Sequence, residues 1–429
     1  MVASILVLGA SGLIGADIVG RLVREGRAVV AVARRFSAPP TPGAVAVEAP
    51  IVDLDAEALA ALLRSHAPSL VVNCLGVLQG GSTGEVHVGF LRRLTEACRA
   101  LPVPPTLVHI SIPGVPDDDA TEFARTKREG EDVVRRSGLR HAILRPGFVV
   151  AHGAFGGSAL VRAVAASPVT LPASDLARPF QSVAGADIAR TVAHLADHPP
   201  DGGVEWDLMH PDRTLLGDVV DAHRAWLGRP RHRFALPGWL TGIGAFASDL
   251  AGRLGWRPPT RSTALAELRR GITGDPRPWM ATTGIMPRSL ADALAERPAT
   301  VADRWFARLY PLKAVTLVTL AAFWIASGLI ALASFTEARA ILLAAGFPLV
   351  LATAITWVSS LMDIAIGALI AHRRTTRFGL WAGIAVSVFY LAGAAILTPA
   401  MWLEPLGALV KTFPAIVLMG VCLTTLDDR

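Results

Sequence analysis

Tyrosine, lysine and cysteine are all scarce in this chain of 429 residues. The two tyrosines are Tyr310 and Tyr390, so any chemistry carried by the first 309 residues must do without a tyrosine. The lysines are Lys127, Lys313 and Lys411, although lysine and arginine together number 41, so nearly all basic residues are arginine. The three cysteines show no paired spacing, which argues against a disulfide framework and a cysteine-based zinc site. We expect no metal site.

Charge is nearly absent from long stretches after residue 312. Four runs contain no charged residue or a single one: 314–336, 340–362, 378–403 and 405–426. A helix needs about 20 apolar residues to cross a bilayer, so we predict four membrane-spanning helices. The second run continues to residue 372, which exceeds one span, and its first turns are expected at the membrane interface. These runs explain why the hydrophobic fraction of the whole chain is as high as 52%.

Two charged residues lie within these runs, Asp363 in the second and Lys411 in the fourth. A charged group in lipid is costly and usually faces the interior of a helix bundle or a partner. One hypothesis is a contact between Asp363 and Lys411. In the other, the Lys411 side chain extends to the membrane surface.

Positive charge gathers on one side of the predicted spans. The opposite loops hold only Arg339. The basic side comprises Arg304, Arg308, Lys313, Arg373, Arg374 and Arg377. Because basic loops stay in the cytoplasm, we predict a multi-pass protein of the inner (plasma) membrane with both termini cytoplasmic.

The segment just before the first predicted span is strongly basic. Residues 224–313 hold 15 basic and 6 acidic residues, which suits membrane lipids of an anionic leaflet. No nucleic-acid-binding motif accompanies the arginines, so we expect no nucleic-acid partner. The segment also has apolar residues at helical spacing, for which we favour a core-packing face over one lying on the membrane: Trp239, Leu240, Ile243, Phe246, Leu250 and Leu254.

Short apolar runs alternate with helical patterns in the first 150 residues. The candidate strands are 4–9, 28–33, 44–49, 70–76, 106–111 and 141–147. This alternation predicts an α/β doubly wound, Rossmann-like parallel sheet with helices on both faces. A late strand at 204–209 is expected on the substrate side. We predict three domains, namely the sheet domain (1–215), a small substrate lobe with the juxtamembrane segment (216–305) and an all-α four-helix transmembrane domain (306–429).

The first strand is followed by GASGLIG, with glycines at positions 9, 12 and 15. Glycines permit a tight turn, and the N–H groups of the next helix can bind a pyrophosphate. The expected cofactor-binding residues here are Gly9, Ser11, Gly12, Leu13, Ile14 and Gly15. The G-x-x-G-x-x-G spacing resembles the extended and atypical short-chain dehydrogenase/reductase families.

Further residues extend this resemblance in the family's order over about 190 positions. It implies that Asp53 and Leu54 contact adenine, and that Cys74, Leu75 and Gly76 lie beside the cofactor. The resemblance also implies that Ser111 occupies the position of the family's catalytic serine. The remaining matches are Lys127 at the catalytic lysine and Pro146, Gly147 and Phe148 in the segment that passes the nicotinamide.

The second strand ends at Ala33 and is followed by Arg34 and Arg35. An NAD-preferring site usually has an acidic residue here, but none occurs between Glu25 and Glu48. Arginine suits a 2′-phosphate, so we favour NADP(H) over NAD(H).

The family's Tyr-x-x-x-Lys pair is incomplete. In TEFARTKREGE (121–131), Lys127 fits the lysine, but Phe123 occupies the tyrosine position and cannot exchange a proton. One hypothesis is that the proton comes from Glu122, Ser111, His152 or an ordered water. A second is that the substrate needs hydride transfer with little acid assistance. A third hypothesis is that the domain binds nucleotide without turnover. The domain also resembles two groups of proteins that do so, the NmrA-like regulators and the accessory Rossmann subunits of respiratory complex I.

SSLMDIAIGALI (359–370) and WLEPLGALVK (402–411) resemble the DoxX-like four-helix membrane family, some members of which are associated with quinone-linked redox chemistry. The resemblance covers about residues 306–429. Together the two resemblances imply a membrane-tethered NADP(H) oxidoreductase for a lipophilic carbonyl or quinone-like substrate. The alternative is a non-catalytic nucleotide-binding sensor or an assembly or accessory protein with a respiratory-chain partner.

Overall fold

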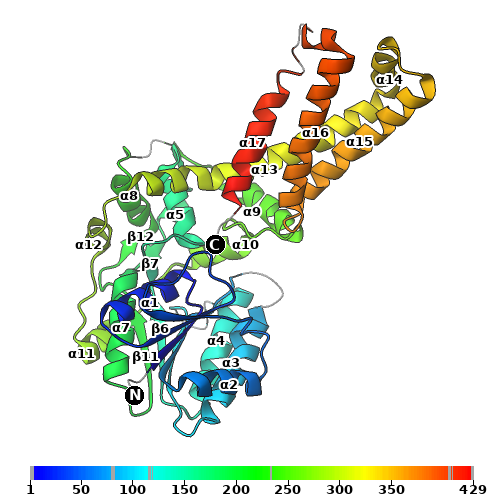
Figure 1. Cartoon of the computed structure of the whole chain (residues 1–429). Coiled ribbons are helices and arrows are strands. Elements are labelled where there is room, and N and C mark those ends of the chain that lie inside the picture. The colour runs from blue at the N-terminus through cyan, green and yellow to red at the C-terminus, as the bar shows by residue number, and fades with distance from the viewer. Residues whose placement is uncertain are drawn as a thin grey trace. The chain divides into compact units, whose positions relative to one another are not determined.

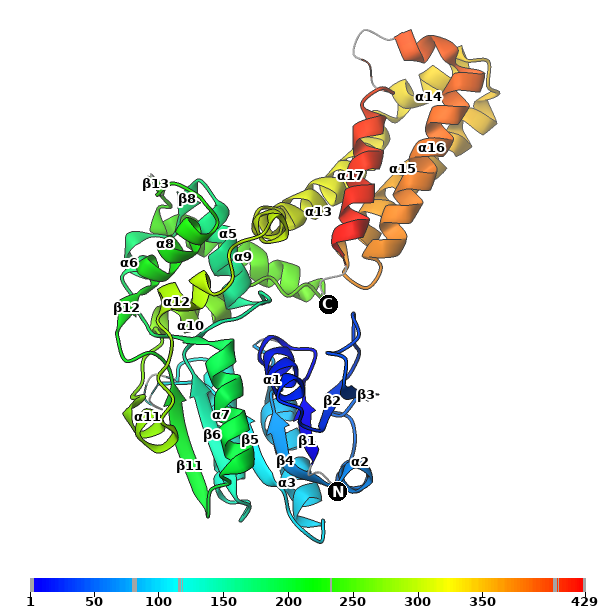
Figure 2. The ribbon, with the colours of Figure 1, turned by 60° about the vertical axis from the view of Figure 1, so that its left-hand side comes forward.

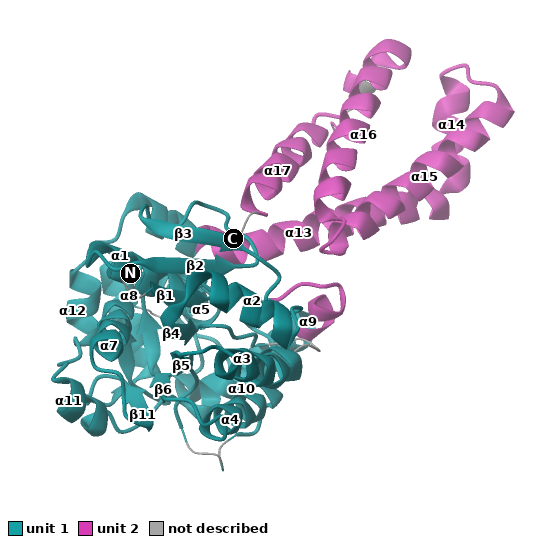
Figure 3. Cartoon of the chain, turned by 60° about the horizontal axis from the view of Figure 1, so that its bottom comes forward, with its two compact units in different colours: residues 1–248, 258–307 teal, residues 249–257, 308–429 magenta. Residues whose placement is uncertain are grey.

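The computed structural model describes residues 4–78, 83–114, 117, 119–231, 234–403, 407 and 409–426. The chain divides into two compact units (Figure 3). The sheet unit comprises residues 1–248 and 258–307, and the helical unit comprises 249–257 and 308–429. Residues 216–305, expected to form a substrate lobe, lie in the sheet unit except for 249–257.

A seven-stranded parallel sheet lies at the centre of the sheet unit (Figure 1). In spatial order its strands are β11 (Gly203–Leu208), β6 (His141–Pro146), β5 (Thr106–Ile110), β4 (Pro68–Asn73), β1 (Ser4–Leu8), β2 (Val29–Ala33) and β3 (Ala44–Glu48). The six strands predicted in the first 150 residues are confirmed. The late strand 204–209 was wrongly placed on the substrate side, because β11 pairs in parallel with β6 at the sheet edge.

Helices cover both faces of this sheet, as the doubly wound prediction requires (Figure 2). The helices α1 (Leu13–Arg24) and α7 (Gly185–Asp197) pack on one face, whereas α2 (Ala56–His66), α3 (Phe90–Arg99) and α4 (Glu122–Arg135) pack on the other. Strand order reverses between β1 and β4, and in such sheets a crevice forms at the carboxyl ends of the two strands.

Smaller elements complete the sheet unit. A second core joins β7 (Phe148–Val150) to α5 (Gly157–Ala166), α8 (Leu216–Trp226) and α12 (Leu290–Ala295). The others are η1 (Glu85–Gly89), β8 (Val169–Thr170), α6 (Ala173–Leu176), β9 (Pro179–Phe180), β10 (Ser182–Ala184), β12 (Thr214–Leu215), β13 (Phe234–Ala235), α10 (Ser262–Arg270) and α11 (Arg277–Thr283). The helix α9 (Gly238–Arg253) continues from this unit into residues of the helical unit.

A buried carboxylate fixes α4 to the sheet. Glu131 accepts hydrogen bonds from Arg145 of β6 at 2.9 and 2.8 Å, and from Arg128 at 3.0 Å. Burial alone would raise the pKa of Glu131, but the hydrogen bonds and positive charge of Arg145, together with the charge of Arg128, lower it below its usual value. Because Lys127 lies one turn before Glu131, this anchor also fixes the position of Lys127.

The helical unit contains most of α13 (Val301–Ala333), from residue 308 onward, and all of α14 (Phe335–Ala344), α15 (Leu349–Ala371), α16 (Thr376–Leu397), η3 (Pro399–Leu403) and α17 (Thr412–Thr425). Among the described residues, α13, α15 and α16 are long and apolar enough to cross a membrane. The second predicted span is divided into α14 and α15 before Leu349. The fourth is not confirmed, because α17 has 14 residues, about 21 Å of helix, and residues 404–406 and 408 lie outside those described.

Polarity in the helical unit is inverted relative to a water-soluble bundle. Large apolar side chains such as Val318 and Phe389 are exposed, whereas Asp363 is buried. Its carboxylate accepts hydrogen bonds from Ser327 at 3.0 Å and Tyr390 at 3.2 Å. An apolar exterior, with the few polar side chains buried between the helices and hydrogen-bonded there, is the arrangement of a membrane protein.

The structure does not bring Asp363 and Lys411 together. Lys411 is exposed at the N-terminal cap of α17, and its side chain makes no contact with Asp363 within the described residues. The polar partners of Asp363 are instead neutral hydroxyl groups on α13 and α16. The predicted contact was therefore wrong, because two nearby helices already supply donors to this carboxylate.

Trp279 generates a stability prediction. It is fully buried in the core between the sheet and α7, and its indole N–H donates to Thr191 at 3.0 Å. We expect Trp279→Ala to lower the free energy of unfolding by about 3–5 kcal/mol, measured by urea unfolding of the detergent-purified protein. Trp279→Phe should cost less, and Val103→Ala, at an exposed position, should change it by under about 0.5 kcal/mol. An unchanged midpoint for Trp279→Ala would contradict this account of the core.

Candidate cofactor and active site

The turn between β1 and α1 leaves no room for side chains. Gly9 has a φ of +77°, a left-handed conformation that favours glycine. A Cβ on Gly15 would lie 2.3 Å from the carbonyl oxygen of Gly9, so α1 can start this close to the strand only with glycine there. Ser11 is exposed, and Gly12, Leu13 and Ile14 are half-buried. This cradle fits a pyrophosphate at a helix N-terminus.

The end of β2 carries both positive and negative side chains. Arg34 and Arg35 are exposed and form no ion pair within the described part of the chain. In the sheet register, Ala33 lies opposite Glu48, and the Glu48 carboxylate accepts a hydrogen bond from the Phe36 N–H at 2.7 Å. Sequence reasoning missed this acidic group, because only the pairing of β2 with β3 brings it here.

The loop after β3 is held in place by α3. The Arg93 guanidinium donates to the carbonyl oxygens of Leu54 at 2.9 Å and Val52 at 2.6 Å. Asp53 between them is exposed, and Leu54 is partly buried against the core. The two residues expected at the adenine therefore lie in a fixed loop that follows β3.

Lys127 is buried at the carboxyl ends of β4 and β5. Its ammonium donates to the carbonyl oxygens of Leu75 at 3.1 Å and Ile110 at 3.0 Å, which leaves its third N–H available. A Cβ on Gly76 would lie 3.4 Å from the Lys127 nitrogen, so nothing larger than glycine shields it on that side. Burial lowers the Lys127 pKa to about 8, although Cys74 and Glu131 act in the opposite direction.

Phe123 lies one turn before Lys127 and is half-buried. Its ring meets the edge of His87, with centroids 5.6 Å apart. His87 accepts from the Val77 N–H at Nε2 and therefore donates from Nδ1 to Thr126 at 2.8 Å. Burial lowers the pKa of His87 to about 3, so this imidazole is neutral and is not an acid near pH 7.

The other predicted site residues lie at or just after the carboxyl ends of β4, β5 and β6. Burial raises the pKa of the Cys74 thiol to about 12, with Lys127 opposing it. Ser111 is buried directly after β5, and its hydroxyl has no hydrogen-bond partner among the described residues. Pro146 is the last residue of β6. The Gly147 N–H donates to the carbonyl oxygen of Leu208 at 2.8 Å, and the Phe148 N–H donates to the carbonyl oxygen of Gln181 at 2.8 Å.

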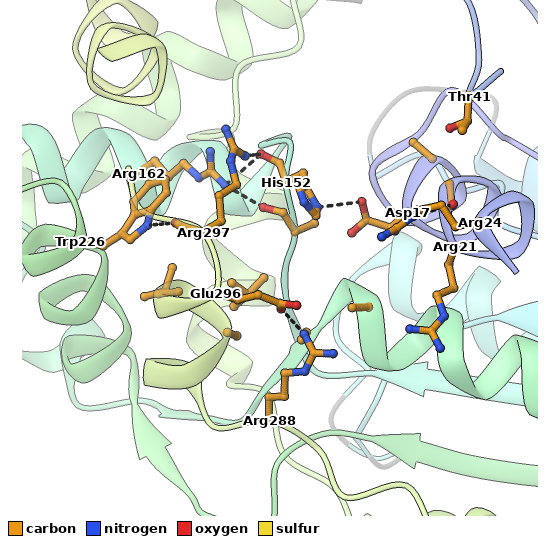
Figure 4. A pocket seen from close by; sticks show the side chains of 18 residues that line it. Asp17, Arg21, Arg24, Thr41, His152, Arg162, Trp226, Arg288, Glu296 and Arg297 are labelled. Carbon is orange, nitrogen blue, oxygen red and sulfur yellow. Dashed lines mark hydrogen bonds and ion pairs between the residues drawn. The ribbon is translucent and has the colours of Figure 1, made fainter. Parts of the chain in front are cut away.

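A cavity of about 520 Å³ lies elsewhere in the sheet unit (Figure 4). It is lined by α1, α5, α8, α12 and the segment with His152, which lies 3.5 Å from Asp17. Arg162 and Arg297, which line it, both contact Asp303, so much of its positive charge is already compensated. Neither Phe123 nor Lys127 lines this cavity. The structure thus separates His152 from the expected proton-transfer position.

Comparisons with known proteins agree with this geometry. Residues 9–199 match an NAD(P)H-binding family, and residues 321–420 match the DoxX-like family. The dTDP-6-deoxy-L-talose 4-dehydrogenase (NAD(P)(+)) of Kitasatospora kifunensis is 34% identical over 111 residues, 25% of this chain. The chain spans about a third (35%) of the length of this curated relative.

Solved structures share the fold of the sheet unit. MoeE5 in complex with UDP-glucose and NAD is 21% identical, with a TM-score of 0.52 over 72% of this chain and 99% of MoeE5. UDP-glucose 4-epimerase of Thermotoga maritima with UDP-glucose is 17% identical, with a TM-score of 0.53 over 68% of this chain and 96% of the epimerase. The chain therefore joins a Rossmann-like domain that matches an NAD(P)H-binding family to a domain that matches the DoxX-like family.

Proposed function

We propose that this protein is a membrane-tethered oxidoreductase that favours NADP(H) and acts on a lipophilic carbonyl or quinone-like substrate. The observation that supports this proposal most directly is the buried Lys127 ammonium, which has one N–H available at the carboxyl edge of the sheet. Three apolar helices in the same chain supply the tether. The basic flanks of those helices favour the inner membrane and a cytoplasmic sheet unit.

The residues of the site fit a nicotinamide dinucleotide. The glycine turn at Gly9 and Gly15 would hold the pyrophosphate, and Lys127 would hold ribose hydroxyls. The exposed Arg34 and Arg35 would bind a 2′-phosphate. When bound, the cofactor supplies or accepts a hydride. The chain's own residues then position the substrate, exclude water and handle the proton.

Phe123 favours an acceptor whose reduction product has a weakly basic oxygen, because such an oxygen needs no proton donor beside it. Reducing a simple ketone produces an alkoxide, which needs a strong proton donor nearby. Reducing a quinone produces a phenolate, and a phenol has a pKa near ~10, so proton delivery can be delayed. The same argument disfavours oxidation of a sugar hydroxyl, which needs a base where this chain has a phenyl ring. A quinone-like substrate therefore agrees best with position 123.

The second candidate function is nucleotide binding without turnover, either as a sensor or as an accessory protein of a respiratory complex. Two observations favour it: Phe123 cannot exchange a proton, and the His87 imidazole beside it is neutral with both nitrogens engaged. Lys127 would still bind the cofactor. Measuring turnover therefore separates the two functions.

The decisive experiment measures NADPH oxidation by the detergent-purified protein with short-chain quinones, aldehydes and ketones. We expect turnover with quinones in the wild type. Phe123→Tyr should raise turnover with aldehydes and ketones by about 100-fold or more, since a positioned general acid contributes about that much. Phe123→Leu is the matched control that changes packing without adding a hydroxyl. Tight NADPH binding with no turnover across the panel would contradict the enzyme and support the sensor.

Cofactor preference has its own test. Replacing both Arg34 and Arg35 by alanine should weaken NADPH binding by about 10–100-fold, the effect of losing one or two charge-assisted hydrogen bonds, while NADH affinity changes little. Fluorescence titration of each nucleotide measures both affinities. Glu48→Gln is the companion variant, because it removes the carboxylate at the end of β3. Tighter binding of NADH than of NADPH by the wild type would refute the preference.

Lys127 predicts a pH dependence of cofactor affinity. Its pKa of about 8 means that the ammonium is present below pH 8 and lost above it. Since the cofactor's hydroxyls and phosphates favour the charged form, affinity should be constant below pH 8 and fall up to ~10-fold per pH unit above it. In Lys127→Met, affinity should be weak and free of this dependence. Calorimetry at pH 7 and pH 9 checks the change, and an identical slope in the variant would assign it to another group.

A further inference from the structure

The helix α9 presents an apolar face to the outside. Trp239, Ile243, Phe246 and Leu250 follow one another at spacings of four, three and four residues, which places them on one side of the helix. Their exposed fractions lie between 50% and 73%. The expectation that this face packs into the core was therefore wrong.

The opposite face of α9 is small and polar, and this is the side that packs inward. Ala245 is buried, and Thr241 and Ser248 are half-buried. The hydroxyls of Ser248 and Thr260 lie 2.6 Å apart, and Thr241 accepts a hydrogen bond from Arg269 at 3.3 Å. A water-soluble protein buries the apolar stripe of a helix and exposes its polar stripe, so α9 has the reverse arrangement.

The chain that follows α9 is fixed to the end of a candidate membrane span. The Trp256 indole N–H donates to the carbonyl oxygen of Ala371, the last residue of α15, at 2.7 Å. The Arg373 N–H donates to Leu254 at 3.0 Å, and its guanidinium lies 5.9 Å from the centre of the Trp256 ring. These contacts all lie within the helical unit. They hold the end of α9 beside the carboxyl end of α15.

We propose that α9 is an interfacial membrane helix whose apolar face is buried in lipid. Continuity supports lipid as the occupant, because the apolar face leads directly to residues bound to the end of a span. Basic residues near this junction suit the headgroups of anionic lipids: Arg253, Arg257, Arg261, Arg373 and Arg374. The chain thus contacts the bilayer through a surface helix in addition to its spans. This inference does not depend on the proposed enzymatic activity.

A spin-label experiment on the full-length protein tests the proposal. A nitroxide is attached at Phe246→Cys, in proteoliposomes containing anionic lipid, and its collision rates with oxygen and with a water-soluble nickel chelate are compared. Val103→Cys is the matched control, since Val103 is an apolar residue exposed by 76% in the loop before β5. Wild type treated with the same label serves as the blank: Cys98 and Cys422 are buried, and this sample measures any labelling of the half-buried Cys74.

Lipid burial predicts that the label at 246 collides several-fold more with oxygen and several-fold less with the nickel chelate than the label at 103. Ile243→Glu should then raise nickel accessibility at 246, because a carboxylate draws the helix out of the apolar layer. Equal nickel accessibility at the two positions would overturn the proposal. Shielding at 246 from both reagents would also overturn it and indicate a protein contact, with spin–spin broadening identifying a second copy. The circular dichroism spectrum and thermal unfolding midpoint of each variant, compared with those of the wild type, confirm that it is folded.

Discussion

Burial of the Lys127 ammonium is the constraint around which the site is organised. A buried charge is costly unless hydrogen bonds replace water, and here the carbonyl oxygens of Leu75 and Ile110 do so. Both carbonyls lie at the ends of parallel strands, so the sheet must bring β4 and β5 together before the lysine can be accommodated. The Glu131 anchor one turn later then fixes the helix. In a chain of arginines, a compact ammonium at this position is a specific choice.

The same buried charge influences its neighbours. It disfavours a proton on His87, and burial acts in the same direction, so this imidazole is neutral and serves only to link Val77 to Thr126. Phe123 packs against it in place of a tyrosine hydroxyl. Compared with the Tyr-x-x-x-Lys pattern that the sequence resembles, the lysine is present and the tyrosine position is an apolar contact. The proposed preference for substrates that need a hydride more than an acid rests on this difference.

Local features of the site could be predicted from sequence, but features that depend on strand register could not. The glycine turn and Lys127 follow from short patterns, since each needs only its own strand and helix. Glu48 was missed because it reaches the end of β2 only through the pairing of β2 with β3. His87 was missed because it lies on η1, a π-helical turn whose pattern has no clear sequence signature. The sequence also left open what faces Asp363, since three helices must pack before its hydroxyl partners are defined.

The spacing of apolar residues along a helix is similarly limited as a predictor of structure. The spacing of Trp239, Ile243 and Phe246 identifies a face, but it does not say whether that face meets a core or a membrane. The choice depends on whether the opposite face of the helix is packed against the protein. On α9 it is, because the polar side chains of that face form hydrogen bonds with Thr260 and Arg269. A helix whose polar side is the packed side has no core left for its apolar side. Asp363 in the helical unit follows the same pattern, since its polar group is hydrogen-bonded between helices while apolar side chains face outward. The same principle therefore describes both the candidate spans and α9, the helix that precedes them.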